Sequence, residues 1–248
     1  MTSGSGPSAE PRHARQLMLR EIGGPGQAKL AAATVGVVGA GGLGGPAALL
    51  LAAAGVGTIR IWDDDAVELS NLQRQIQFGE GDVGAGKADA LADRVRALDG
   101  GLRVEAHDER IGNNAAEALR GCDVVLDCTD SFASRYGLNR ATRELGVALV
   151  SGAAAGWRAQ VGVFNASPGA PCYRCFVPEP PPDAPDCETV GIVGAVVAVA
   201  GGVQALEAVK LITGAGRTLS GRLWIWDGLA GEARTVSVAG EPDCPVCG

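Results

Sequence analysis

Short apolar runs alternate along the chain with longer stretches that carry apolar residues at helical spacing. The runs are rich in β-branched residues and have the length of buried strands. In the first part of the chain they lie at 34–38, 58–62, 103–106, 123–126 and 148–150. Helical stretches lie between them at 46–54, at 87–98 and through Arg143. This order predicts an α/β fold with a doubly wound, mostly parallel sheet.

The pattern changes after about residue 155. Three further strand-like runs follow at 160–164, 223–226 and 234–238, and we expect them to be antiparallel. An apolar stretch at 190–213 lies among them. Glycines interrupt its first half and Gln204, Glu207 and Lys210 follow, whereas a membrane span needs about 20 consecutive apolar residues. We therefore predict a buried core helix.

Length, charge and composition restrict the class of protein. The 248 residues suffice for one large domain, and no linker composition divides them. We predict a flexible Ser/Gly/Pro-rich tail at 1–11 and a single domain at 12–248. A net charge of −7 and a pI near 4.9 argue against nucleic acid or an anionic membrane as the main partner. The tail lacks the apolar core of a signal peptide, so we expect a cytoplasmic protein.

Three successive segments predict a nucleotide site. A G-x-G-x-x-G loop at 39–44 follows the first predicted strand, and its glycines allow the backbone to approach phosphate. The second strand ends in three aspartates at 63–65, which offer an acid for ribose hydroxyls without showing which one binds. The run SNLQRQ at 70–75 then places polar and basic groups beyond the sugar. A redox dinucleotide site does not need this third segment, so the pattern favours ATP over NAD.

Two C-x-x-C pairs predict a metal site apart from the nucleotide. Their members are Cys172, Cys175, Cys244 and Cys247. Four thiolates in this arrangement suit a closed, structural zinc site, and the alternative is two independent thiol pairs. Pro171 and Pro245, which flank or interrupt the pairs, favour zinc.

The remaining cysteines have two interpretations. Cys187 follows a segment at 178–186 that is too rich in proline for a helix or a central strand. It precedes the predicted core helix, whose end could favour a thiolate, so it is either an acyl or persulfide acceptor or an incidental exposed cysteine. Cys122 and Cys128 flank the fourth predicted strand in apolar surroundings, and we interpret them as core residues.

Together these motifs closely resemble the ThiF/MoeB group of the ubiquitin-activating-enzyme superfamily, whose fold is Rossmann-like. The resemblance covers the chain from about Arg12 to Gly248 and departs from the family pattern at Ser131, where Asn is usual, and Ala195, where Pro is common. It implies an adenylyltransferase, a nucleotidyltransferase that activates the C-terminal glycine of a small ubiquitin-like sulfur carrier ending in Gly-Gly. The carrier is then converted to a thiocarboxylate. No rhodanese-like segment is present, so we expect the sulfur to come from a separate donor protein or from sulfide.

The resemblance also assigns residues. It implies that the half before about residue 155 binds ATP and that the half after it binds the carrier and zinc. The implied ATP ligands are Gly39, Gly41, Gly42, Asp63, Ser70, Asn71, Arg74, Gln75, Lys87 and Asp130. Asp130 would hold Mg²⁺, although it could also cap the following helix. Arg15 would reach the ATP of a partner subunit in a homodimer, and the implied catalytic residues are Arg15, Arg74, Lys87, Asp130 and Cys187.

The implied chemistry suits this composition. A carboxylate that is already ionised attacks the α-phosphorus of ATP, so the step needs alignment and charge neutralisation rather than a general base. An NAD-dependent oxidoreductase would share the glycine loop but would leave the run at 70–75 and the paired cysteines unexplained. A non-catalytic partner subunit would keep the fold and lose phosphate-side residues, yet Arg74, Lys87 and Asp130 are present.

Overall fold

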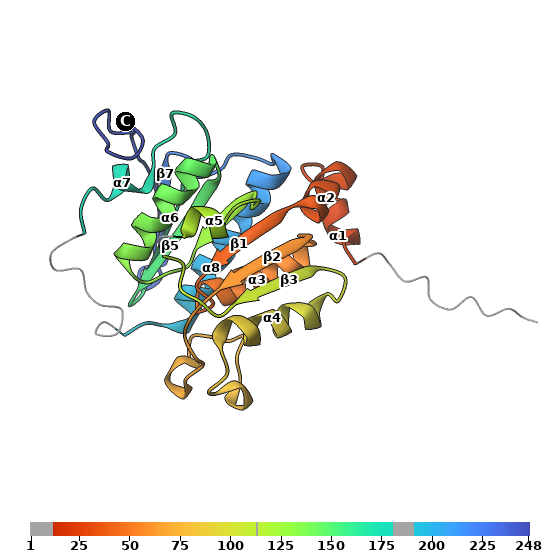
Figure 1. Cartoon of the computed structure of the whole chain (residues 1–248). Helices are drawn as coiled ribbons and strands as arrows, with labels where there is room; N and C mark the ends of the chain where they lie inside the picture. Colours follow the sequence, from red (N-terminus) through yellow and green to blue (C-terminus); the bar gives the residue numbers. More distant parts are fainter. Residues whose placement is uncertain (1–11, 113, 181–190) are drawn as a thin grey trace, which may run out of the picture.

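The computed structural model describes residues 12–112, 114–180 and 191–248. These residues form one eight-stranded sheet and the helices around it (Figure 1). The strand order is β3-β2-β1-β4-β5-β6-β7-β8. The strands are β1 (Thr34–Val38), β2 (Thr58–Trp62), β3 (Arg103–His107), β4 (Val124–Asp127), β5 (Ala148–Ala155), β6 (Arg158–Phe164), β7 (Arg222–Asp227) and β8 (Glu232–Ser237). Strands β1 to β5 are parallel, and β6, β7 and β8 each run antiparallel to the preceding strand. The predicted mostly parallel sheet with antiparallel C-terminal strands is confirmed.

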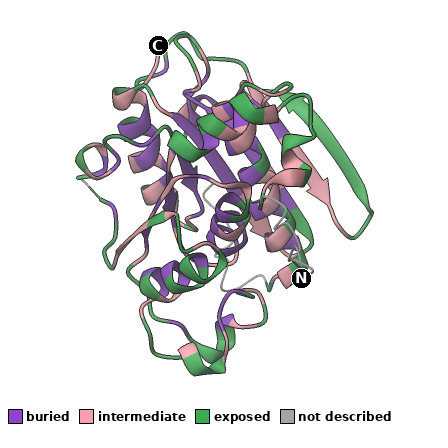
Figure 2. Ribbon diagram, turned by 90° about the vertical axis from the view of Figure 1, so that its right-hand side faces the viewer, coloured by how far each residue is buried: buried purple, intermediate pink, exposed green. Residues whose placement is uncertain are grey.

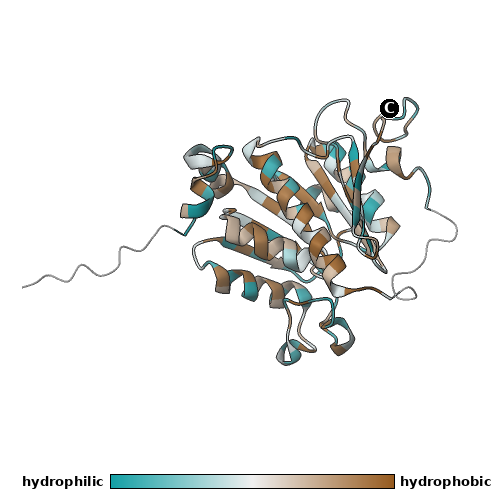
Figure 3. Cartoon of the chain, turned by 180° about the vertical axis from the view of Figure 1, so that it is seen from behind, coloured by the Kyte–Doolittle hydropathy of each residue, from teal (hydrophilic) through white to brown (hydrophobic). Residues whose placement is uncertain are grey.

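Helices cover both faces of the sheet (Figures 1 and 3). They are α1 (Ala14–Leu17), α2 (Gly23–Ala32), α3 (Gly44–Ala54), α4 (Lys87–Leu98), α5 (Ala115–Ala118), α6 (Phe132–Leu145), α7 (Tyr173–Phe176) and α8 (Gly194–Thr213), with short 3₁₀ turns η1 (Leu69–Asn71) and η2 (Glu80–Asp82). Residues of α2, α3, α4 and α8 share one core cluster, and residues of α5 and α6 share another. The sheet is therefore covered from both sides, as a doubly wound fold requires.

Burial on both faces explains the continuous apolar runs. In β1, Val35 and Val37 belong to the cluster under α3 and α8, while Val38 belongs to the cluster under α6. Adjacent strand residues point to opposite faces, so both sets must be apolar. By contrast, β8 is exposed along its whole length at the edge of the sheet (Figure 2).

The apolar helix α8 belongs to the core, as predicted. Length and composition alone would allow it to cross a membrane, but Val197, Ala200 and Ala205 pack in the main core cluster. Its polar side chains are partnered inside the protein. The Gln204 amide donates to the backbone oxygens of Asp127 (2.8 Å) and Val150 (3.0 Å). These bonds attach α8 to the carboxyl end of β4 and to β5.

Some elements differ from the sequence prediction. Strand β5 continues to Ala155, well beyond the predicted end, because Gly156 at φ +57° and Trp157 form a two-residue turn into β6. Helix α2 was not predicted, since three glycines and Pro25 disfavour a helix interior. The proline lies in the first turn, where it is tolerated, and Leu30 is completely buried. Tertiary packing therefore decides this helix.

Candidate active site

A cleft of about 410 Å³ lies at the carboxyl ends of the parallel strands. The strand order reverses between β1 and β4, and ligands of open α/β sheets bind in the crevice at such a point. The cleft is lined by most of the residues that the sequence analysis selected: Gly39, Gly41, Gly42, Asp63, Asn71, Arg74, Gln75, Lys87 and Asp130. Ser70 does not line it; the Ser70 hydroxyl donates to the carboxylate of Glu68, which does, at 3.2 Å.

The glycine loop lines the cleft, and two of its glycines have no room for a side chain. Gly39 has φ +97°, and a Cβ there would lie 2.7 Å from the Cys128 carbonyl oxygen. A Cβ at Gly42 would lie 2.9 Å from Val197 of α8. Glycine is therefore required at these two positions, where the bare backbone allows close approach of a phosphate.

A buried glutamine that the sequence analysis did not select holds this loop. The Gln77 amide donates to the carbonyl oxygens of Ala40 (2.8 Å) and Gly41 (3.1 Å). Its neighbour Gln75 is also buried, and among the described residues the Gln75 side-chain oxygen has no hydrogen-bond partner. Because Gln75 lines the cleft, a bound ligand could satisfy this oxygen.

The three aspartates after β2 have different partners. Asp63 accepts hydrogen bonds from the backbone amides of Ala40 (2.6 Å) and Asp65 (2.9 Å), so it joins the glycine loop to the following turn. Burial raises the pKa of Asp63, although these two amides and Lys87 act in the opposite direction. Asp64 pairs with Arg110 at 3.1 Å, and this contact raises the pKa of Arg110. The sequence left the choice among the three open; the structure places only Asp63 against the glycine loop.

Four basic residues line the cleft: Arg74, Lys87, Arg110 and Arg135. The sequence analysis expected two of them, Arg74 in the loop after β2 and Lys87 at the start of α4. The Arg74 guanidinium donates to the Ser70 carbonyl at 3.2 Å and is half-buried. Lys87 is buried at the first position of α4, and its ammonium lies 2.8 Å from the Asp65 carboxylate. Both cations therefore line the cleft, and each has a partner within the protein.

Asp130 lies at the carboxyl end of β4 with an exposed side chain. In the part of the chain that the structure describes, no hydrogen bond or ion pair holds its carboxylate. The alternative that Asp130 caps α6 is wrong, because the Ser131 hydroxyl is the cap and accepts from the Ser134 amide at 3.1 Å. Ser and Asn are equivalent caps, which gives a physical reason for Ser131 at a position where Asn is usual.

A buried acid supports the turn beside Asp130. Asp127 is completely buried, and its carboxylate accepts from the hydroxyls of Thr129 and Ser151, both at 2.7 Å. Asp127 was not among the predicted site residues. The available signal was its place between the fourth predicted strand at 123–126 and Asp130.

Among the described residues, the predicted residue Arg15 also does not line this cleft. Arg15 is exposed on α1, which is attached to the far end of α3 by a 2.9 Å hydrogen bond from Gln16 to the Ala54 carbonyl. The glycine loop precedes the other end of this 11-residue helix, so about 16 Å of helix separates the two. Cys187 and the tail at 1–11 lie outside the described residues.

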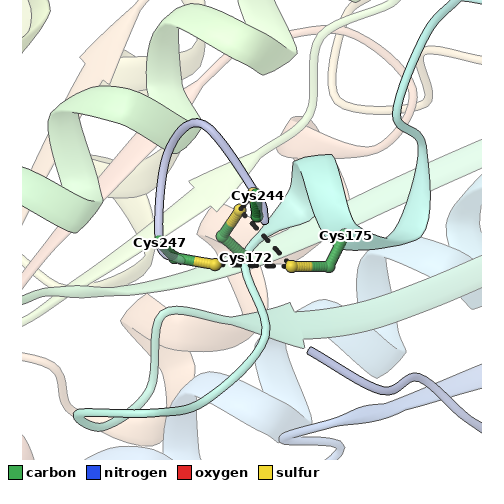
Figure 4. Close-up of side chains that lie close together, drawn as sticks. All are labelled: Cys172, Cys175, Cys244 and Cys247. Carbon is green, nitrogen blue, oxygen red and sulfur yellow. Dashed lines mark hydrogen bonds between the residues drawn. The ribbon is translucent and has the colours of Figure 1, made fainter. Parts of the chain in front are cut away.

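The four paired cysteines converge although the pairs are far apart in sequence (Figure 4). Their sulfur atoms lie within 4.8 Å of one another, with close pairs at 3.4, 3.6 and 3.9 Å. Tetrahedral zinc with Zn–S bonds of about 2.3 Å separates its sulfurs by about 3.8 Å, so the cluster fits zinc. It joins the segment around α7 to the C-terminus and does not line the cleft.

The other two described cysteines are core residues, as predicted. Cys122 and Cys128 are both buried. Burial raises the pKa of Cys122 to about 11 and also raises the pKa of Cys128. Although Cys128 lines the cleft, its thiol stays protonated at neutral pH and is a poor nucleophile.

Comparison with known proteins identifies the family. The ThiF family model matches residues 13–246, which is nearly the whole chain. This chain belongs to the ThiF family. The predicted resemblance is thereby confirmed, and the residues that line the cleft lie within the matched region.

Curated relatives of this ThiF family chain cover it almost completely. It is 43% identical over 244 residues to the "Sulfur carrier protein adenylyltransferase" of Thermus thermophilus, covering 96% of this chain and 90% of the relative. It is also 43% identical over 243 residues to the "SAMP-activating enzyme E1" of Haloferax volcanii, covering 96% and 88%. It is 40% identical to the "Adenylyltransferase and sulfurtransferase MOCS3" of Caenorhabditis briggsae but spans only 60% of that relative, and it spans about half of two Zea mays relatives (50% and 51%).

Solved structures show the same fold at lower identity. The chain aligns with E. coli MccB at a TM-score of 0.85 and 20% identity, covering 98% of this chain and 74% of MccB. A structure of E. coli MccB with ATP gives a TM-score of 0.81 at 22% identity, covering 98% of this chain and 75% of MccB. At this identity the similarity establishes the fold alone.

Proposed function

We propose that this chain is an adenylyltransferase that uses ATP to activate the C-terminal glycine of a small ubiquitin-like sulfur-carrier protein. The observation that carries the proposal is one cleft that combines a glycine loop, Asp63, Asp130 and the predicted cations Arg74 and Lys87. This chain covers most of the length of two relatives, whose names specify carrier adenylation or activation. An NAD-dependent oxidoreductase would not account for Arg74 and Lys87 on the phosphate side of the cleft.

Each residue has a part in the proposed reaction. Asp63 accepts hydrogen bonds from the ribose hydroxyls, and the glycine backbone faces the phosphates. Asn71, Arg74, Gln75 and Lys87 bind the triphosphate. The carrier carboxylate attacks the α-phosphorus, an acyl–phosphate bond forms, and the bond to pyrophosphate breaks. The cations neutralise the charge that develops on the departing pyrophosphate, so the chain contributes alignment and electrostatics rather than proton transfer.

The cleft is suited to magnesium held together with ATP. Mg²⁺ is commonly bound by one or two carboxylates plus substrate phosphates, and Asp130 offers an exposed carboxylate at the cleft. When bound, the ion would neutralise phosphate charge and help to orient the triphosphate. The hydrogen bonds of Asp127 to Thr129 and Ser151 hold the turn from which Asp130 extends.

Zinc has a structural role in this proposal. Cys172, Cys175, Cys244 and Cys247 would supply four ligands and leave no open position for substrate. The ion would hold the C-terminal segment against the segment around α7. We assign the carrier to the part of the chain after residue 155, beside this joined region.

The second step of the proposal converts the activated carrier to a thiocarboxylate. Sulfide would displace AMP at the carrier carbonyl and give the thiocarboxylate directly. The outer sulfur of a protein persulfide would displace AMP to form an acyl disulfide; a cysteine thiolate would then attack the donor sulfur, release the thiocarboxylate and remain in a disulfide with the donor. Cys187 is the proposed acceptor for this step, since Cys128 is buried with a raised pKa. The cytoplasm, where thiols remain reduced, suits this chemistry.

We also propose a homodimer formed through α3 and α8. Leu50, Val199 and Leu206 are exposed on these two helices, and Leu50 lies beside Gly202 of α8, so they form one apolar surface, the α3–α8 patch. A two-fold axis through this patch, at right angles to the helices, would bring the far end of α3 toward the partner's glycine loop. Arg15 lies at that far end and could then serve the partner's ATP.

Carrier-dependent ATP–pyrophosphate exchange tests the function. Candidate carriers are small proteins with a Gly-Gly terminus, and a carrier that lacks its last glycine is the matched control. We expect exchange with one intact carrier and none with its shortened form. Carrier binding without any exchange would instead support a non-catalytic partner subunit.

A further inference from the structure

The ion pair between Lys87 and Asp65 is asymmetric. The Lys87 side chain is only 9% exposed, whereas the Asp65 side chain is 58% exposed, and their charged atoms lie 2.8 Å apart. Lys87 is also the first residue of α4, where the helix dipole disfavours a cation. Burial and the dipole both oppose the ammonium charge, so Lys87 requires an anionic partner. Asp65 could lose its partner at little cost, because water already reaches its carboxylate.

Hydrogen bonds fix the backbone around the pair. The Lys87 amide donates to the Asp65 carbonyl at 2.9 Å, and the Val67 amide donates to the Ala85 carbonyl at 2.8 Å. These bonds hold the start of α4 beside the turn after β2. A change of partner by Lys87 therefore needs only a side-chain movement. Both side chains line the cleft, so a ligand phosphate can reach Lys87.

We propose that Asp65 is a positioning residue that holds Lys87 in the nucleotide-free protein and is replaced by the ATP phosphates when nucleotide binds. The inference rests on the proposed function, because Lys87 must contact phosphate. A triphosphate carries several negative charges against one on Asp65, so the exchange favours the ligand. The exchange also lowers the affinity of the protein for ATP, because the contact between Lys87 and Asp65 is lost when ATP binds.

The same exchange assists release of the product. Once pyrophosphate has formed, Asp65 competes with it for Lys87 and resumes the contact as pyrophosphate leaves. Asp65 therefore prevents the product from remaining tightly bound to a buried cation. Removal of the Asp65 charge should make pyrophosphate a stronger inhibitor of the forward reaction.

The test measures binding of a non-hydrolysable ATP analogue with Mg²⁺ by calorimetry, without a carrier. Asp65→Asn keeps the side-chain size and removes the charge; Asp64→Asn removes a charge one residue away that pairs with Arg110 instead. We expect Asp65→Asn to bind the analogue about tenfold more tightly, or about 1.4 kcal/mol. Asp64→Asn should change affinity by less than about threefold, as expected for a screened charge.

A double-mutant cycle separates competition for Lys87 from general repulsion of phosphate. In a Lys87→Met background, Asp65→Asn should increase the affinity for the analogue by no more than Asp64→Asn does. Asp65→Asn should also lower the melting temperature of the nucleotide-free protein by about 2–4 °C. The increase in melting temperature that the analogue causes should be larger in this variant than in the wild type. A lower melting temperature with unchanged or weaker binding would overturn the inference, as would equal tightening in the Lys87→Met background. If the wild-type protein binds no ATP analogue, the proposed function itself is wrong.

Discussion

Replacement of Lys87 is the most direct perturbation of the proposed phosphate site. Lys87→Met removes the charge and keeps an unbranched apolar side chain in a buried position. Lys87→Ala removes the side chain beyond Cβ as well. Arg94→Ala is a matched control, because Arg94 lies on the same helix, forms a 2.7 Å ion pair with Asp82 and does not line the cleft.

The structure indicates the size of the effect. The Lys87 ammonium is largely removed from solvent, so its contact with the departing pyrophosphate should resemble a preorganised charge-assisted contact rather than a surface ion pair. Loss of such a contact costs about 2.7–4 kcal/mol, which corresponds to a fall in rate of about 100- to 1,000-fold. Arg74 is only half-buried, and Arg74→Ala should fall toward the lower end of this range.

Carrier-dependent ATP–pyrophosphate exchange is the assay, with circular dichroism and melting temperature as checks on folding. Lys87→Met and Lys87→Ala should both lose exchange by at least about 100-fold, whereas Arg94→Ala should retain the wild-type rate. A folded Lys87→Met protein that exchanges at near wild-type rate would refute the assignment of Lys87 to phosphate. An equal loss in Arg94→Ala would show that the effect is not specific to the cleft.

Three further predictions concern zinc, sulfur transfer and assembly. Cys244→Ser should lose about one zinc per chain and should also lose thermal stability, because the binding energy of a structural metal contributes to folding. If the wild-type protein, purified without chelators, contains no metal, the zinc site is wrong. Cys187→Ala should keep pyrophosphate exchange and lose thiocarboxylate formation, and mass spectrometry of the carrier showing full conversion would make Cys187 a bystander. Leu206→Asp should place a charge in the α3–α8 patch and give monomers by light scattering. Leu229 is exposed on the β7–β8 turn, so the control Leu229→Asp should leave the dimer intact. An unchanged dimer in Leu206→Asp would exclude the proposed interface.

Local sequence was sufficient to predict most of the sheet. The runs at 34–38 and 58–62 became β1 and β2 with the same bounds, and the stretch at 87–98 became α4. Their periodicity is strong because each element buries at least one face. Helix α2 was not predicted because its glycines and proline have low helix propensity. Packing of Leu30 and Gly26 against neighbouring elements overrides this low propensity.

The candidate site shows the same division. Glycines, an acid and the polar run are close in sequence and follow adjacent parallel strands, so their common location at one sheet edge could be predicted. The helix cap could not be assigned between Asp130 and Ser131, which are adjacent residues with similar capping ability. Nor could Gln77 be recognised, because its amide bonds to the loop at Ala40 and Gly41 depend on how a distant turn packs.

The charge partners of the cleft were decided only by the tertiary structure. The sequence determined that Asp63, Asp64 and Asp65 follow β2 and that Lys87 begins a helix, but three adjacent carboxylates have no distinguishing pattern. The fold places Ala40, Arg110 and Lys87 against them from three different elements, so each acid acquires a separate partner. Electrostatic interactions fall with distance and strengthen with burial, and both quantities arise from packing between segments rather than from order along the chain.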